Sequence, residues 1–193
     1  MQQTPDDLAT RAASDLDAFV QLYNTYFQRV YNYIYYRCSE QAEVEDLTAK
    51  VFERLILYIN RYSPQKGPFE VWLFAIVRNV VNDHYHRSRF TWLPWETLQR
   101  QPTGDPSPEE ELTLHENLDE LQQALQKLDQ RSRDLVSLKF FARLTNRQIA
   151  GLMHQSETSV GVALFRAITR LRKWLGSTQD PCGPGSSGTG AES

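Results

Sequence analysis

The sequence predicts an all-α protein built as two small helical domains joined by a flexible linker. Apolar residues recur at helical spacing over most of the chain, without the alternation of strands, and a segment rich in proline separates two such regions. With 193 residues, 40% of them hydrophobic, the chain is long enough for two small domains. We expect a first domain over residues 12–90, a linker over 91–107, a second domain over 108–175 and a disordered tail over 176–193.

Three helices are expected in the first domain. The first, over residues 19–34, follows the i, i+3, i+4, i+7 spacing of one buried helical face. The second, over 44–59, begins beside Glu43, Glu45 and Asp46, acids that favour the positive end of a helix dipole. Pro64 and Pro68 then interrupt the pattern before a third helix over 69–89.

The second domain is expected to begin at Ser107-Pro108-Glu109-Glu110, which has the residues of a capping box with proline in the first turn. Leucines follow at alternating spacings of four and three over residues 114–128. This seam lasts only two heptads, so it favours a helix packed in a small bundle over a coiled coil. Further helices are expected over 134–141, 145–153 and 157–174.

The last two of these helices form a helix-turn-helix pattern. Thr145 and Gln148 stand at capping-box positions, and the turn at residues 154–156 is followed by a basic helix with Ser156 as its cap. Such a second helix fits the major groove of DNA, where its side chains reach base edges. An ordinary three-helix bundle with a solvated basic face is the alternative.

Charge is distributed unevenly along the chain. The formal net charge is −3, but residues 61–100 carry six basic and three acidic residues, and residues 136–175 carry seven and one. A polyanion could therefore be held at two separate places on an acidic protein. The alternative is that these charges only cover solvated helix faces.

Several classes of protein are not expected from this sequence. Cys38 and Cys182 are too few for a disulfide framework or a zinc site, and His84 and His86 do not share a helical face. Neither a glycine-rich phosphate loop nor a nucleophile elbow is present. No secretory signal or membrane-spanning run occurs. We therefore expect a soluble cytoplasmic protein that is not an enzyme, with no cofactor, no metal, no small-molecule substrate and no membrane insertion.

Two separate blocks of the sequence resemble extracytoplasmic-function (ECF) RNA polymerase sigma factors, group 4 of the sigma-70 family. Glu45-Asp46-Leu47-Thr48 and residues 51–55 are similar to region 2.2, and residues 69–79 with Asp83 and Arg87 are similar to regions 2.3 and 2.4. Residues 124–128, 133–141, 144–145, 148–150, 159–160, 164–167 and 171–172 are similar to region four. The resemblance covers about residues 14–175.

The resemblance implies core RNA polymerase and promoter DNA as partners, and an anti-sigma factor as a candidate regulator. Polymerase binding would fall to the helix over residues 44–59, with Asp46, Lys50 and Glu53 as its contacts. Solvated surface is the alternative for each of these three residues.

The loop over residues 61–68 and the helix that follows would read the melted minus-ten element. A flipped base needs polar groups for its edge and aromatic rings for its face, and the phosphates need cations. The candidates of these three kinds are Tyr62, Lys66, Phe69, Trp72, Arg78, Asn79, Asn82, Arg87 and Arg89. Trp72 also fits the apolar stripe, so core packing is its alternative.

The helix-turn-helix would read the minus-thirty-five element, with candidates at its turn and on its basic faces: Arg147, Gln155, Glu157, Thr158, Ser159, Arg166 and Arg170. Where the family has a basic or polar run, this chain has Gly161-Val162-Ala163, none of which can make a bidentate base contact. We therefore expect weaker or differently read upstream recognition.

Two alternatives to a working sigma factor are a helix-turn-helix regulator that never binds polymerase and a degenerate sigma-like interaction protein. The first leaves residues 40–89 without a purpose, whereas the second is favoured by the Gly161-Val162-Ala163 run.

Overall fold

The computed structural model describes residues 4–38, 40–90 and 120–176, with side chains up to Tyr85 in the second range. Within these ranges the chain forms helices and no strand, which confirms the all-α prediction. The predicted linker, the helix start at Ser107 and the tail after Gly176 lie outside the described residues. None of the described helices is both long and apolar enough to cross a membrane.

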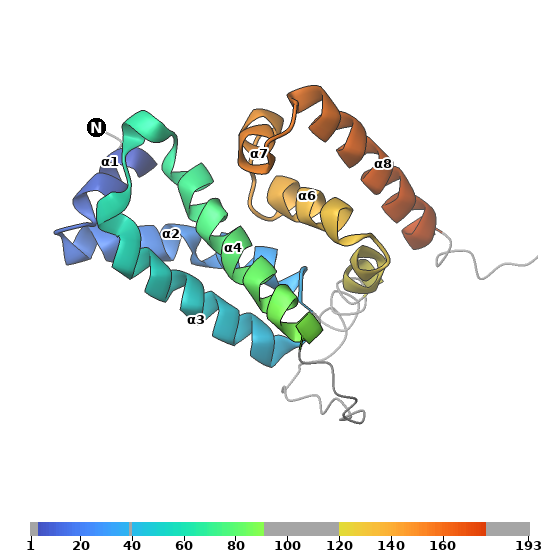
Figure 1. Ribbon diagram of the computed structural model, residues 1–193, viewed down its shortest axis with the longest axis horizontal. Helices are drawn as coiled ribbons and strands as arrows, with labels where there is room; N and C mark the ends of the chain where they lie inside the picture. The colour runs from blue at the N-terminus through green and yellow to red at the C-terminus, as the bar shows by residue number, and fades with distance from the viewer. Residues whose placement is uncertain (1–3, 39, 91–119, 177–193) are drawn as a thin grey trace, which may run out of the picture.

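The first bundle consists of α1 (Pro5–Arg11), α2 (Leu16–Tyr35), α3 (Gln41–Tyr58) and α4 (Phe69–Phe90) (Figure 1). Helices α2, α3 and α4 form at the three expected places because their apolar stripes meet in one core. The aromatic rings of Tyr33 and Phe74 meet edge to face there, with centroids 5.9 Å apart.

Helix α1 begins before the residues that the sequence pattern assigned to the first domain. Thr4 caps it by accepting a hydrogen bond from the Asp7 amide, Pro5 occupies its first turn, and Leu8 and Ala9 are buried. It packs on α2 and α4. Asp15 then caps α2 by accepting from the amides of Asp17 and Ala18.

The second bundle consists of a helical segment over residues 120–126, α6 (Gln130–Phe140), α7 (Asn146–Met153) and α8 (Glu157–Gly176). Arg133 on α6 secures the end of the segment by donating to the carbonyl oxygens of Leu125 (2.9 Å), Gln126 (2.6 Å) and Leu128 (3.1 Å). Helix α8 packs on both α6 and α7.

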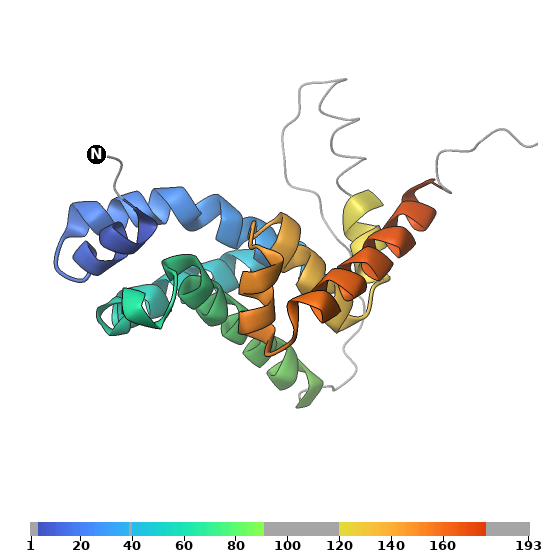
Figure 2. The same ribbon diagram turned by 90° about the horizontal axis from the view of Figure 1, so that it is seen from above.

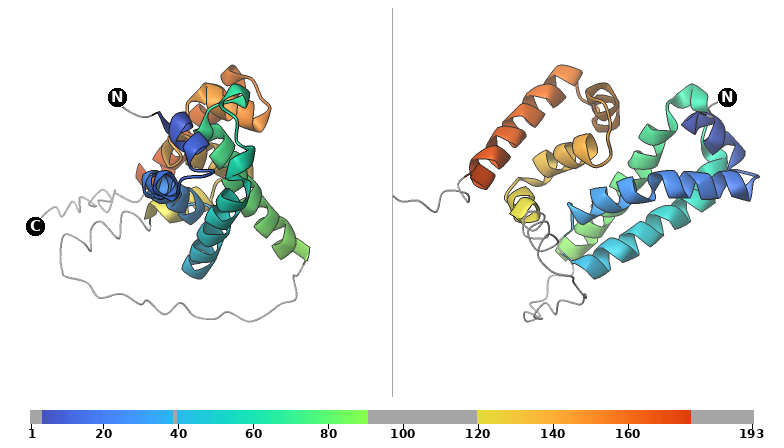
Figure 3. Two further views of the ribbon diagram at one scale, coloured as in Figure 1. Left: turned by 90° about the vertical axis from the view of Figure 1, so that its left-hand side faces the viewer. Right: turned by 180° about the vertical axis from the view of Figure 1, so that it is seen from behind.

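The two bundles lie against each other through α4 and α7 and through contacts of α2 with α6 and with the turn after it. In Figure 1, α6 and α7 face the first bundle, and α8 lies on the far side. Figures 2 and 3 show the same arrangement from above, from one side and from behind. One side of α4 therefore faces the second bundle, where it contacts α7.

Candidate nucleic-acid interface

The loop between α3 and α4 is held in place by the N-terminal helix. It contains two short 3₁₀ turns, η1 (Ile59–Arg61) and η2 (Pro64–Lys66). One carboxylate oxygen of Asp6 accepts hydrogen bonds from the Tyr62 hydroxyl and from the amide of Phe69, both at 2.7 Å. Gly67 closes the loop with a φ of 146°, a conformation open to glycine and costly for other residues. Asp6 thus fixes the loop and supplies an acceptor at the start of α4.

Three aromatic residues predicted to contact DNA form one cluster beside this loop. Phe69 is fully buried, with its ring centroid 5.4 Å from Tyr62 and 6.0 Å from Trp72. Tyr62 and Trp72 are partly buried, with centroids 5.6 Å apart. Burial raises the pKa of Tyr62 above its ordinary value, and the bond to Asp6 acts the same way, so its hydroxyl stays protonated. Phe69 packs against the other two rings from the core side, and neither face of its own ring is exposed.

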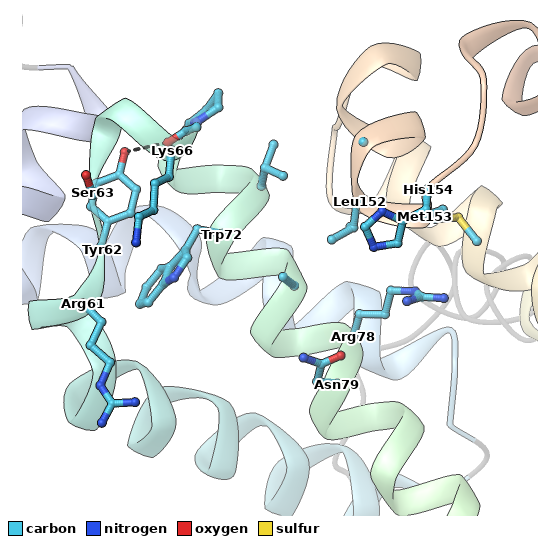
Figure 4. A pocket seen from close by; sticks show the side chains of 15 residues that line it. Arg61, Tyr62, Ser63, Lys66, Trp72, Arg78, Asn79, Leu152, Met153 and His154 are labelled. Carbon is cyan, nitrogen blue, oxygen red and sulfur yellow. Dashed lines mark hydrogen bonds between the residues drawn. The ribbon is translucent and has the colours of Figure 1, made fainter.

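A cleft of about 670 Å³ runs from this cluster along α4 to the end of α7. It brings together five of the predicted minus-ten residues: Tyr62, Lys66, Trp72, Arg78 and Asn79. Figure 4 shows Tyr62, Lys66 and Trp72 at one end of the cleft and Arg78 and Asn79 further along α4, with Arg78 extending toward the second bundle. Aromatic rings, an amide and cations are thus combined in one cleft, a combination suited to a single strand of nucleic acid.

Two of the predicted minus-ten residues, one cation and one amide, are bonded to other residues of the protein. The Nε of Arg78 lies 2.8 Å from the Oδ2 of Asp134 on α6. The Oδ1 of Asn82 accepts from Arg37 at 3.3 Å, and Asn82 does not line the cleft. Arg87 and Arg89 belong to the last turns of α4, and their side chains lie outside the described part of the chain.

Sequence reasoning missed several residues that line the cleft. Arg61 borders it, with its guanidinium carbon 4.8 Å from the centre of the Tyr58 ring. Its position at the start of the loop was a usable signal, because it adds a cation to the same basic segment. Leu152, Met153 and His154 close the opposite side (Figure 4). No local pattern could have identified them, because tertiary packing alone brings α7 to α4.

The helix-turn-helix has the predicted local structure. The hydroxyl of Thr145 accepts from the Gln148 amide at 3.2 Å, and the Gln148 side chain accepts from the Thr145 amide at 2.8 Å. His154 ends α7 in the left-handed conformation with a φ of 54°. Ser156 caps α8 by accepting from the Ser159 amide at 3.1 Å. The turn between the two helices is therefore fixed by its own residues.

The predicted minus-thirty-five residues gather at this turn and along α8. Residues 157–159 at the start of α8 are exposed, as are Arg147 on α7 and Arg166 and Arg170 on α8, and Gln155 is partly exposed. Arg170 lies 3.8 Å from the Asp129 carboxylate in a pair that is more than half exposed, so solvent screens it. These side chains remain accessible to a DNA duplex.

Two exposed apolar residues on α8 were not selected from the sequence. Val162 is 45% exposed and Phe165 is 71% exposed, and Phe165 directly precedes Arg166. An exposed aromatic or aliphatic side chain beside a cation can contact a thymine methyl group in the major groove. Both lie off the buried positions Val160 and Leu164, and the helical period would have shown this.

The predicted polymerase contacts lie on the exposed side of α3. Asp46 and Lys50 form an ion pair one turn apart, and Glu53 is exposed. Large apolar side chains beside them were missed: Ile56 and Leu57 at the end of α3 are each 60% exposed. On α2, Leu16, Val20 and Tyr23 are also exposed, and the Tyr23 ring centre is 4.6 Å from that of Phe52 on α3. Exposed apolar residues on neighbouring helices are typical of a protein-binding surface.

Comparisons with known families assign both bundles. The family model described as Sigma-70 region 2 matches residues 22–91, and the model described as Sigma-70, region 4 matches residues 118–171. Together the two models match more than half of the chain.

Curated relatives and solved structures agree with this assignment. The ECF RNA polymerase sigma factor BldN of Streptomyces coelicolor is 33% identical over 172 residues, which cover 88% of this chain and 65% of that protein. SigX of Bacillus subtilis is 25% identical over 168 residues, with 82% and 84% covered. This chain therefore spans slightly less than two thirds of BldN.

Two solved structures have the same fold. CnrH, solved in complex with the cytosolic domain of CnrY, gives a TM-score of 0.69 at 21% identity, with 90% of this chain and 97% of that chain covered. RpoE of Bartonella quintana, solved with the anti-sigma factor NepR, gives 0.64 at 17% identity, with 84% and 98% covered. The fold and the matched regions define a two-domain protein of the sigma-70 type. The chain belongs to the sigma-70 family.

Proposed function

We propose that the chain is a working ECF sigma factor that binds core RNA polymerase and directs it to specific promoters. The observation that carries the proposal is the pairing of an aromatic and basic cleft on α4 with a capped helix-turn-helix on α7 and α8. Residues 12–90 act as sigma region 2, residues 108–175 as region 4, and residues 91–107 as the linker between them. The protein works in the cytoplasm and performs no chemistry of its own.

The cleft on α4 holds the melted minus-ten strand. Tyr62 and Trp72 are partly exposed and supply faces on which a base can stack. Asn79 is exposed in the same cleft and offers both donor and acceptor atoms to a base edge. Lys66, Arg87 and Arg89 bind phosphates of the strand. Arg78 binds phosphate as well, once its ion pair with Asp134 has opened. Phe69 and Asn82 position the others, since the first is buried and the second is bonded to Arg37.

The helix-turn-helix reads the minus-thirty-five duplex. Residues at the start of α8 reach base edges, while Arg147, Arg166 and Arg170 hold phosphates on either side. Because Gly161, Val162 and Ala163 offer no hydrogen-bonding side chain, upstream recognition depends on fewer polar contacts and more on shape and apolar contact.

Core polymerase binds the exposed face of α2 and α3. Asp46, Lys50 and Glu53 provide its charged part, and the exposed apolar residues of both helices provide the desolvated centre. An anti-sigma factor is a second protein partner in this proposal. Support comes from the shared fold of CnrH and RpoE, whose structures were solved as complexes with CnrY and with the anti-sigma factor NepR.

A degenerate sigma-like interaction protein is the second candidate. The specific observation in its favour is the apolar run at residues 161–163, at the place where a recognition helix needs polar groups. Such a protein would bind polymerase or another factor without activating a promoter.

A run-off transcription assay tests the proposal. Purified core RNA polymerase is incubated with the full chain on fragments of the chain's own upstream DNA. We expect discrete transcripts that disappear when the chain is omitted. Polymerase binding without any transcript, on these and other promoters, would favour the degenerate protein, and failure to bind polymerase would leave a plain DNA-binding regulator.

Two matched lysine variants separate the cleft from general charge. Lys66→Ala removes an exposed lysine of the cleft, and Lys127→Ala removes an exposed lysine outside both DNA-binding surfaces. Loss of one phosphate contact to a single strand should make the negative slope of log K against log salt less steep by about 0.7. We expect this for Lys66→Ala only. Equal effects of the two variants would exclude a specific role for the cleft.

A further inference from the structure

One buried carboxylate of the second bundle joins two helices of the first. Asp134 on α6 is 3% exposed. Its Oδ1 accepts a hydrogen bond from the Tyr33 hydroxyl at 2.5 Å and lies 3.0 Å from the Nη1 of Arg37, while its Oδ2 accepts from the Nε of Arg78 at 2.8 Å. Tyr33 belongs to the last turn of α2, Arg37 lies just beyond the end of that helix, and Arg78 belongs to α4. A single side chain therefore bridges three elements.

The charge of Arg37 makes this bridge hard to remove while the bundles stay together. Arg37 is 1% exposed, and its other polar partners are neutral: the carbonyl of Gln130 at 3.4 Å and the side chain of Asn82 at 3.3 Å. Asp134 is the carboxylate paired with it. A buried cation that loses its carboxylate is strongly unfavourable, so loss of Asp134 favours separation of the bundles and hydration of Arg37.

Three further contacts join the first and second bundles. The ring of Tyr36 stacks on Phe141, with centroids 3.9 Å apart and planes 12° from parallel. The guanidinium of Arg29 donates to the carbonyl of Ala142, with Nε 3.2 Å from the oxygen. The side chain of Gln122 lies 3.5 Å from the carbonyl oxygen of Cys38. This interface is mainly polar and aromatic, like interfaces that open and close during function.

The position of α7 gives this contact a consequence for the cleft. Leu152 and His154 form the side of the cleft opposite Trp72 and Asn79, as Figure 4 shows. Because α7 forms one wall of the cleft, it narrows the space that a DNA strand has beside those residues. Arg78, which faces the same side, has its Nε paired with Asp134, so this carboxylate competes with a phosphate for the guanidinium.

We propose that the second bundle docks in cis on the minus-ten surface of the first, and that Asp134 and Phe141 are the latch of this closed state. The partner of the minus-ten surface in the free protein is thus the chain's own helix-turn-helix domain. Promoter reading requires the latch to open, which frees Arg78 and removes α7 from the cleft. This inference rests on the proposed function for the identity of the cleft, but the latch itself is tested without DNA.

The full chain contains an internal reporter of opening. Its cysteines are Cys38 and Cys182, so a Cys182→Ser background leaves Cys38 as the one thiol. Cys38 is 1% exposed and lies where the segment over residues 120–126 meets the first bundle. Separation of the bundles exposes it, and its rate of labelling by a maleimide then rises.

The test compares two latch variants with a matched control. Asp134→Asn removes the buried charge with little change of shape, and Phe141→Ala removes the stacked ring without altering any charge. Arg54→Ala removes a different ion pair, between Arg54 and Asp83 at 3.4 Å, which joins α3 and α4 inside the first bundle. Circular dichroism confirms that each variant is folded, and Phe141→Ala decides the question if Asp134→Asn does not fold.

Three quantities are measured: the labelling rate of Cys38, the radius of gyration from solution scattering, and the affinity for a short labelled single-stranded oligonucleotide of mixed sequence. We expect both latch variants to label faster, to expand and to bind the oligonucleotide about tenfold more tightly, because the apparent affinity scales with the fraction of open protein. Arg54→Ala should change none of the three.

Unchanged labelling and scattering in both latch variants would overturn the proposal. Opening without tighter binding, in a protein that does bind the oligonucleotide, would overturn it as well, because the cleft would then not be covered. Faster labelling and expansion with no oligonucleotide binding and no transcription by polymerase in any variant would support the latch and refute the proposed function.

Discussion

Replacing Gly161 tests both the stability of α8 and its contact with DNA. Gly161 is the fifth residue of α8, and a Cβ built there meets a single neighbouring atom within 4 Å, the Nδ2 of Asn146 at 3.9 Å. That distance is ordinary van der Waals contact. Alanine in a helix interior is favoured over glycine by about 0.8–1.0 kcal/mol. We therefore expect Gly161→Ala to stabilise the protein by about 1 kcal/mol.

Thermal unfolding followed by circular dichroism measures this gain. The melting temperature should rise by about 2–4 °C if the whole chain unfolds together, and by about 4–8 °C if the second bundle unfolds alone. Gly67→Ala is the control, because a φ of 146° strains any residue with a Cβ even though space is free there. It should lower the melting temperature. A decrease for Gly161→Ala would refute the reasoning about α8.

Gly161→Lys then isolates the contribution of charge to upstream binding, with Gly161→Ala as its reference for helix stability. One added phosphate contact makes the negative slope of log K against log salt steeper by about 0.9. Fluorescence anisotropy on a duplex that carries the mapped upstream element measures both variants. We expect Gly161→Lys to bind more tightly at low salt and Gly161→Ala to match the native chain. Equal affinity of the lysine and alanine variants would refute the view that the run at 161–163 weakens recognition.

Three further predictions concern single groups. Burial raises the pKa of the Cys38 thiol to about 11 from 9.0, so in a Cys182→Ser chain alkylation should be slow near pH 8. As pH rises, the thiol loses its proton later in the native state than in the unfolded state. The contribution of the protonated thiol to the free energy of unfolding should therefore be present below about pH 9 and be lost toward pH 11, and denaturant titrations at several pH values would measure this loss. Thr145→Ala removes the cap of α7 and should cost about 1 kcal/mol in the same titrations, whereas Thr169→Ala, on an exposed helical face, should cost less. Phe74→Ala empties a fully buried site and should cost about 3–5 kcal/mol, and a smaller loss would show that the core around Tyr33 closes over the cavity.

Local pattern was enough to predict most of the helices. The stripes of α2, α3 and α4 were visible because each runs for several turns, and the capping box at Thr145 marked the start of α7. Helix α1 was missed because seven residues with a single large buried side chain, Leu8, give no measurable period.

The candidate site was predictable in composition and unpredictable in its contacts. Tyr62, Lys66 and Asn79 were found because the cleft is built mainly from one loop and the helix after it. Phe69 was assigned to DNA, although its ring supports the cluster from inside the core, because an aromatic residue on an apolar stripe gives the same pattern in both cases. The pairing of Arg78 with Asp134 spans 56 positions, and no local signal reports such a contact.

The buried Arg37 shows the same limit in another form. A lone arginine at the end of a helix resembles a solvated residue in the sequence, and only the fold reveals that Asp134 and the rings of Tyr33 and Tyr85 surround it. Charged residues are rarely fully buried unless paired, so the partner had to be known before the burial could be predicted.

The anchor at Asp6 bears on how the protein can be manipulated. A single carboxylate in the first helix bonds both to the Tyr62 hydroxyl and to the first amide of α4. Any truncation, fusion or proteolytic cut that detaches α1 would therefore loosen a loop more than fifty positions away, while leaving α2, α3 and α4 with their own packing. A shortened chain could fold, bind its protein partners through α2 and α3, and still lose discrimination among DNA sequences.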